Sequence, residues 1–167
     1  MAQGHRAFGP AAAEDVAGWC GARVPAVRRV LEGTDGLERL TDEAGRALYD
    51  LPDAPRPGPE VDAPVRLLPA FDSALLAYAP RHRGRILPER HRGAVYEPRN
   101  LKLHATFLVD GLVAGTWIAG VRRREATLTL APLQTLTTAV RRALSEEGER
   151  MLAATQPEAR AVGVAFL

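Results

Sequence analysis

The sequence predicts an α+β protein: a partial winged helix, then an antiparallel β-sheet or small barrel with one long amphipathic helix. Three observations predict this fold. Residues 9–33 fit two short helices joined by a tight turn, residues 104–120 fit a β-hairpin, and residues 52–64 contain five prolines. A proline-rich stretch favours an extended linker and marks a domain boundary. We therefore expect a winged-helix module at 1–51, a linker at 52–64 and a β-rich domain at 65–167.

The first module is predicted to be a helix-turn-helix, with helices over residues 12–20 and 24–32. In the second helix, Pro25 falls in the first turn, where proline is tolerated. Apolar residues then recur at helical spacing, which predicts the face that packs inward. That face consists of Val27, Val30 and Leu31.

A wing is predicted after the second helix. The segment LERLTDEAGRALYDL, residues 37–51, has two short alternating runs around a turn at 42–45. This pattern is typical of a β-hairpin. A winged helix normally begins with a further full helix, but only Gln3 to Phe8 precede Pro10, about one and a half turns at 3.6 residues per turn. We therefore expect the chain to be part of a longer architecture, or to dock on a partner that completes the module.

The second half is predicted to begin with a hairpin at Asp110-Gly111, a strong turn signal between two apolar runs. Pairing across this turn gives two largely apolar faces, so the hairpin should be covered on both sides or curl into a barrel. One face holds Phe107, Val109, Leu112 and Ala114, and the other holds His104, Leu108, Val113 and Trp117.

Three further elements complete the predicted second domain. Residues 126–132, ATLTLAP, alternate in polarity and predict a third strand. Residues 133–155 carry an apolar stripe at helical spacing and predict a long amphipathic helix. Residues 162–166, VGVAF, are predicted to return as a closing strand.

The composition excludes several classes of protein. Of 167 residues, 46% are hydrophobic and 25% are charged, which is typical of a globular chain. No apolar run approaches the length of a membrane span, and the N-terminus lacks an apolar signal core, so we expect a cytoplasmic protein. The single cysteine, Cys20, excludes an internal disulfide and is expected to be buried at the end of a helix.

Charge is distributed unevenly along the chain. Residues 1–64 carry 7 Arg against 11 Asp and Glu, whereas residues 65–167 carry 15 Arg and Lys against 9 acids. A basic half predicts a polyanionic partner, although a solvated face is the alternative interpretation. Two clusters hold most of this charge, one within RHRGRILPERHR (81–92) and one between two predicted strands. They consist of Arg81, Arg83, Arg85, Arg90 and Arg92, and of Arg122, Arg123 and Arg124.

The predicted helix-turn-helix itself has few cations on its outward face. Arg28 and Arg29 lie there, and the wing adds Arg39 and Arg46 among three acids. Because phosphate contacts by Arg and Lys supply most non-specific affinity for DNA, this module is expected to be a scaffold more than a reader. Direct DNA contact by Arg28 and Arg29 is the alternative.

The residues give no strong catalytic or metal-binding signature. His82, His91 and His104 lack a Cys or carboxylate at ligand spacing, so we expect no metal and no cofactor. Asp72, in LPAFDSALL, is surrounded by apolar residues. We expect Asp72 to cap the following helical turn, and the alternative is a buried carboxyl group that could transfer protons.

Three segments together resemble the AlkZ/YcaQ-like winged-helix family of bacterial DNA glycosylases. They are RAFGPAAAEDVAGWCG, LPAFDSALL and TFLVDGLVAGTW, and the similarity runs from about residue 6 to residue 166. The resemblance implies serial winged-helix modules that end in a β-rich region, of which this chain would be the C-terminal half. It implies excision of alkylated bases and unhooking of interstrand crosslinks. It also implies that double-stranded DNA is held on basic concave surfaces, here residues 81–92 and 122–124.

The family's catalytic signature is a Gln-x-Gln or Gln-x-Asp pair in its N-terminal part, which positions the attacking water. The glutamines of this chain are Gln3, Gln134 and Gln156, and none has Gln or Asp two residues later. The resemblance therefore transfers no catalytic residue. The favoured interpretation is a DNA-binding protein that holds duplex DNA by phosphate contacts without catalysis of its own.

Two alternatives remain open. One is a DNA glycosylase that acts on alkylated or crosslinked bases through a group such as Asp72. The other is a protein-interaction module that docks on an N-terminal half or on a protein partner, and an exposed apolar patch around Phe8 and Trp19 would favour it.

Overall fold

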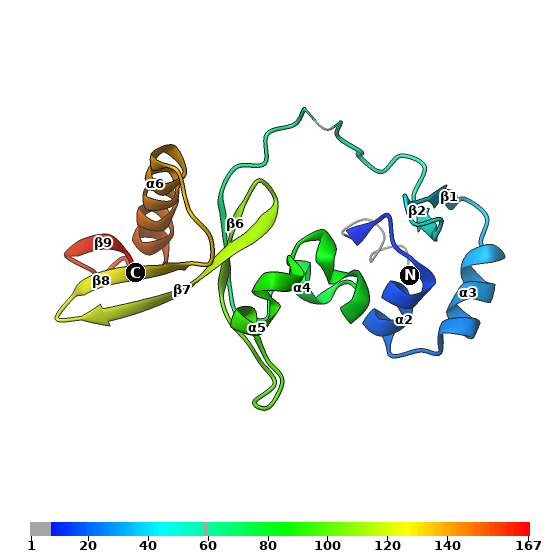
Figure 1. The fold of residues 1–167 in the computed structure, drawn as a ribbon, viewed down its shortest axis with the longest axis horizontal. Coiled ribbons are helices and arrows are strands. Elements are labelled where there is room, and N and C mark those ends of the chain that lie inside the picture. Colours follow the sequence, from blue (N-terminus) through cyan, green and yellow to red (C-terminus); the bar gives the residue numbers. More distant parts are fainter. Residues whose placement is uncertain (1–7, 59) are drawn as a thin grey trace. The chain divides into compact units, whose positions relative to one another are not determined.

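A computed structural model describes residues 8–58 and 60–167, and Figure 1 shows its elements. The chain divides into two compact units: residues 1–61 with 73–84, and residues 62–72 with 85–167. The division falls inside the predicted linker, but residues 73–84 join the first unit rather than the β-rich domain. The short helix considered before Pro10 falls almost wholly on residues 1–7, outside the described residues.

The first unit contains the predicted helix-turn-helix. Helix α2 spans Ala13–Cys20 and helix α3 spans Val24–Glu32, with Pro25 in the first turn of α3. Between them, Gly21 adopts φ +66°, a left-handed conformation that favours glycine. The two helices pack around a small apolar core with the wing. This core consists of Ala13, Ala17, Val27, Leu31 and Tyr49.

Two sequence expectations for these helices are wrong. Val30 is 43% exposed, although its spacing predicted a core position. Val27 and Leu31 belong to the buried cluster shared with α2 and the wing, whereas Val30 lies outside it. Cys20 is also exposed, because it lies in the last turn of α2, where the chain leaves the core.

The wing forms as predicted. Strand β1, Glu38–Thr41, pairs antiparallel with β2, Ala47–Asp50. The turn is closed by Asp42, whose carboxylate accepts hydrogen bonds from the backbone N–H groups of Ala44 and Arg46 at 2.9 and 2.8 Å. This local turn therefore fixes the register of the two wing strands.

Short helices follow the linker. Helix α4, Ser73–Leu76, and the first residues of the 3-10 helix η1, Pro80–Arg85, belong to the first unit. In the second unit, η2 spans Glu89–His91 and α5 spans Arg92–Val95. A small hairpin of β4, Tyr96–Glu97, and β5, Lys102–Leu103, comes next.

The second unit is built on a five-stranded sheet in the order β3-β6-β7-β8-β9. The sheet is open, so the barrel alternative is wrong. It is also mixed rather than purely antiparallel, because β9 runs parallel to β8. A parallel neighbour requires a crossover connection, and the long helix α6 supplies it. The strands are β3 Arg66–Leu68, β6 Thr106–Val109, β7 Leu112–Arg122, β8 Glu125–Pro132 and β9 Ala161–Phe166.

The hairpin of β6 and β7 turns at Asp110-Gly111 as predicted, with Val109 opposite Leu112. A bulge then changes the register, so that Phe107 pairs with Gly115 rather than Ala114. The ring of Phe107 occupies the space that a side chain at Gly115 would need. The bulge therefore buries Phe107 at the centre of the core and disrupts the simple alternation expected from the sequence.

Helix α6 spans Thr138–Thr155, five residues shorter at its start than the predicted 133–155. The helix begins after Thr137, which is its N-cap. The side-chain oxygen of Thr137 accepts a hydrogen bond from Val140 N–H at 3.2 Å. Leu144 and Leu152 pack into the sheet core. Within the described ranges, no helix is both long enough and apolar enough to span a membrane.

Candidate nucleic-acid interface

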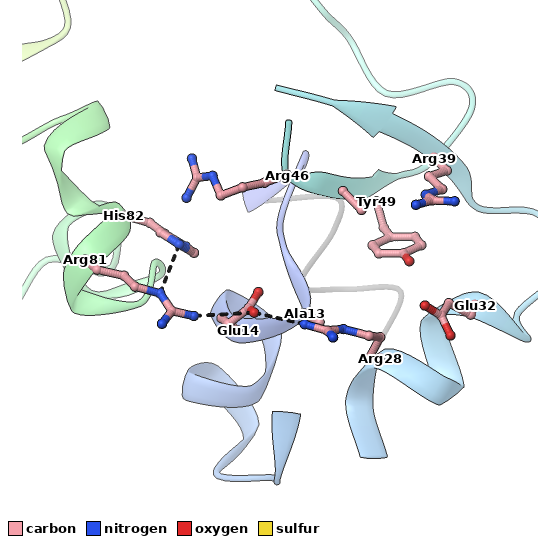
Figure 2. A pocket seen from close by; sticks show the side chains of 10 residues that line it. Ala13, Glu14, Arg28, Glu32, Arg39, Arg46, Tyr49, Arg81 and His82 are labelled. Carbon is pink, nitrogen blue, oxygen red and sulfur yellow. Dashed lines mark hydrogen bonds and ion pairs between the residues drawn. The ribbon is translucent and has the colours of Figure 1, made fainter. Parts of the chain in front are cut away.

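A concave pocket of about 470 Å³ lies in the first unit, between both helices, the wing and the start of η1. Figure 2 shows its side chains reaching inward from these elements. Cations dominate the lining, with four arginines against two glutamates. The polar lining residues are Glu14, Arg28, Glu32, Arg39, Arg46, Tyr49, Arg81 and His82.

Glu14 bridges two of these arginines (Figure 2). Its Oε1 accepts a hydrogen bond from Arg28 Nη2 at 3.1 Å and lies 3.4 Å from Arg81 Nη2. Arg28 comes from α3 and Arg81 from η1, so the carboxylate joins elements that are distant in sequence. Both guanidinium groups remain more than half exposed. They are therefore held close together while still facing solvent.

A buried network positions Arg81. Its Nε donates to His82 Nε2 at 3.2 Å, and His82 Nδ1 lies 2.7 Å from Asp15 Oδ1. Asp15 also accepts the backbone N–H groups of Ala12 and Ala79, at 2.9 and 2.8 Å. Because His82 accepts on Nε2, the proton of its neutral ring belongs on Nδ1, facing Asp15. Asp15 was not predicted as a site residue, because no local sequence pattern links it to a histidine after the linker.

The wing supplies the other two arginines. Arg46 Nε donates to Asp42 Oδ2 at 2.6 Å. The pKa of Asp42 is lowered, most by its hydrogen bond from the backbone N–H of Arg46 and further by the Arg46 side chain. Arg39 pairs with no carboxylate among the described residues. The positive charge of Arg46 therefore lies beside a carboxylate, unlike that of Arg39.

In the second unit, the predicted cluster at 122–124 lies at the tip of the hairpin of β7 and β8, with Arg122 at the end of β7 and Arg123 and Arg124 in the turn. Arg123 and Arg124 both adopt left-handed backbone conformations, with φ +51° and +66°. Two-residue hairpin turns of this kind favour Asn-Gly, because other residues are strained there. Arg124 is held by Glu158, at 3.2 Å. Neither Arg122 nor Arg123 pairs with a carboxylate in the described part of the chain, and both line an open groove of about 550 Å³.

The run at residues 81–92 is divided between the two units, after Gly84. Three of its arginines make local contacts within their own unit. Arg83 donates to the carbonyl of Tyr78 at 3.1 Å, Arg90 donates to Gln134 at 3.2 Å, and Arg92 pairs with Glu89 at 3.4 Å. Arg85 and Arg29 are exposed.

The remaining candidate residues are Asp72 and two histidines. Asp72 is half-buried and immediately precedes α4. His91 Nδ1 donates to the carbonyl of Val113 at 2.9 Å, and His104 Nε2 lies 2.6 Å from Glu97 Oε1. The described residues contain no group of three His, Cys, Asp or Glu side chains placed to bind a metal ion.

Comparison with known proteins identifies the family. The family model described as DNA glycosylase AlkZ-like matches residues 3–154. The fold is similar to that of the Streptomyces sahachiroi DNA glycosylase AlkZ, with a TM-score of 0.71 and 24% sequence identity. This match covers 96% of the present chain and 43% of that protein, so the chain spans less than half of its length. No match was found among curated proteins. Because the family match covers most of the chain and agrees with the sequence resemblance, the chain belongs to the AlkZ-like DNA glycosylase family.

Proposed function

We propose that this chain is the DNA-holding part of an AlkZ-like DNA glycosylase and that it binds duplex DNA by phosphate contacts with little sequence selectivity. The Gln-x-Gln or Gln-x-Asp pair is absent from this sequence, and an N-terminal half or a protein partner would complete the winged helix. The proposed partner, cellular DNA, implies a cytoplasmic location. Phosphate contacts position a protein on DNA without reading its sequence, which fits side chains that reach solvent from turns and helix faces.

The observation that carries this proposal is the hairpin tip at Arg122, Arg123 and Arg124. Two non-glycine residues hold left-handed conformations there. Such strain is retained where a side chain has a role that the favoured turn residues cannot perform. Arginine suits phosphate because its planar guanidinium group donates two parallel hydrogen bonds.

Binding to a labelled plain duplex across a salt series tests the proposal. We expect a log–log slope of several units, since each neutralised phosphate contributes about 0.9. The variant R122A/R123A/R124A should bind more weakly, with the slope reduced by about two units, because Arg124 is already engaged by Glu158. An unchanged slope would remove the hairpin tip from the DNA interface, and absence of binding at low salt would refute the proposed function.

A matched control comes from α6 in the same unit. Arg142 and Arg150 are exposed and pair with Glu146 and Glu147 on their own helix. The variant R142A/R150A removes two charges and is compared with a second hairpin-tip variant, R122A/R123A, which removes the same number. If both double variants weaken DNA binding equally, the effect reflects net charge and not contact by the hairpin tip.

A second candidate function is docking on a protein partner. Trp19 is 54% exposed, and its ring centroid lies 5.4 Å from that of Phe8. Phe8 is half-buried, so Trp19 is the exposed member of the pair, and an exposed tryptophan favours a protein contact. Sedimentation of the wild type and of Trp19→Ser over a range of concentrations tests this. Self-association that the substitution abolishes would favour docking, and a monomer throughout would argue against self-docking through this patch.

A further inference from the structure

The pocket of the first unit holds two guanidinium groups around a single carboxylate oxygen. Arg28 and Arg81 approach Glu14 Oε1 at 3.1 and 3.4 Å (Figure 2). A phosphate oxygen accepts hydrogen bonds from arginine in the same way as a carboxylate oxygen does. The two arginines therefore have the geometry of an anion-binding site, and the carboxylate of Glu14 occupies it.

We propose that this pocket binds one phosphate group and that Glu14 occupies the place of that phosphate in the free protein. The proposal that the phosphate belongs to the DNA backbone rests on the proposed function. Arg28 and Arg81 would contact the phosphate, and Arg39, which also lines the pocket, would add a third positive charge. Glu14 would then act as a competitor that limits affinity.

The arginine pair is prepared for an anion before any ligand binds. Arg81 is fixed by His82 through Nε, and His82 is fixed by the buried carboxylate of Asp15. Side chains that are held in place lose less conformational freedom on binding, so more of the contact energy contributes to affinity. Arg81 contacts His82 through Nε alone, and its Nη2 lies against Glu14 Oε1, the position that the phosphate would take.

The side chain of Glu14 is less exposed than the two arginine side chains that it contacts. The Glu14 side chain is 22% exposed, whereas those of Arg28 and Arg81 are 54% and 66% exposed. An incoming phosphate can therefore reach both guanidinium groups from solvent. The interaction between Glu14 and the arginines is weak at such exposure, so the carboxylate can be displaced.

Removing the charge of Glu14 should strengthen binding. Glu14→Gln keeps the side-chain shape and an acceptor oxygen but removes repulsion between a carboxylate and a phosphate a few ångströms apart. We expect the affinity for duplex DNA to rise about fivefold at low salt. The matched control is Glu43→Gln, which makes the same change in net charge at an exposed wing position outside the pocket.

The test combines two titrations of the 167-residue chain. Duplex binding is measured for the wild type, Glu14→Gln, Glu43→Gln and R28A/R81A. Inorganic phosphate is titrated separately, and the NMR signals of Arg81 Nε and the His82 ring are followed. We expect Glu14→Gln to bind duplex more tightly than Glu43→Gln, R28A/R81A to lose affinity, and phosphate to shift both signals in Glu14→Gln.

The outcomes separate the pocket from the proposed function. Phosphate shifts without duplex binding would keep the pocket as a phosphate site and reject DNA as its ligand, together with the proposed function. Duplex binding with equal effects of Glu14→Gln and Glu43→Gln, and with no phosphate shift, would overturn the pocket and leave the proposed function standing. A melting curve for each variant verifies that the fold is retained.

Discussion

The carboxylate of Asp15 and the imidazole of His82 lie 2.7 Å apart, both buried, although 67 residues separate them. This contact attaches the segment after the linker to the helix-turn-helix. It explains why residues 73–84 belong to the first unit although the proline-rich stretch separates them from it in sequence. The same contact places Arg81 beside Glu14 and so completes the pocket.

Loss of the Asp15 carboxylate should destabilise the first unit. Asp15→Ala leaves the N–H groups of Ala12 and Ala79 and the ring of His82 without their acceptor, which we expect to cost about 3 kcal/mol. Urea unfolding followed by the amide signals of α3 measures the change. Glu43→Ala, on the exposed wing turn, is the control and should alter stability by less than about 0.5 kcal/mol. Equal effects of the two substitutions would contradict the buried role.

The hairpin tip should show opposite effects on stability and binding. The variant R123N/R124G introduces the turn residues that left-handed conformations favour, and R123A/R124A removes the same charges without relieving strain. We expect R123N/R124G to be more stable than R123A/R124A by about 1 kcal/mol, while both lose DNA affinity equally. Thermal unfolding and duplex titration measure the two quantities. Full DNA affinity in R123N/R124G would show that the arginines are not kept for binding.

Close packing of α6 on the sheet should depend on Gly148. A Cβ atom at this position would lie 2.6 Å from Leu128 Cδ2 and 2.9 Å from Val164 Cγ2. Gly148→Ala therefore forces the helix away from β8 and β9, and we expect a loss of about 2 kcal/mol of unfolding free energy. Gly163→Ala, where a Cβ meets nothing within 4 Å, is the control. Denaturant unfolding compares the two variants.

The wing turn should respond to acid through Asp42. Its folded-state pKa lies below the ordinary value of 3.8, chiefly because of the hydrogen bond from the backbone N–H of Arg46. A lowered pKa means that the ionised carboxylate stabilises the fold above pH 3.8, and that this contribution is lost as pH falls through the folded-state pKa. NMR titration should give a midpoint below 3.8. In Asp42→Asn, the stability of the wing should vary less with pH in this range, and a midpoint at or above 3.8 would contradict the assignment.

The sequence determined the elements whose signals are local. Asp110-Gly111 fixed a turn because both residues tolerate left-handed conformations, and Pro25 fitted the first turn of α3. Asp42 closed the wing through bonds within four residues. The three family segments, together, also identified the correct family. Each of these signals depends on neighbours in the chain, so no tertiary contact was needed to interpret it.

Only the tertiary structure decided the strand arrangement of the sheet and the set of residues that meet in the pocket. The bulge next to Phe107 accompanies the packing of its ring into the space at Gly115. Strand β9 runs parallel to β8 because α6 connects the two strands as a crossover. Glu14, Arg28 and Arg81 come from three elements, and the Asp15–His82 contact that positions the last of them spans the linker. Periodicity and turn preferences describe a residue's local conformation, whereas these contacts depend on packing between residues far apart in the chain.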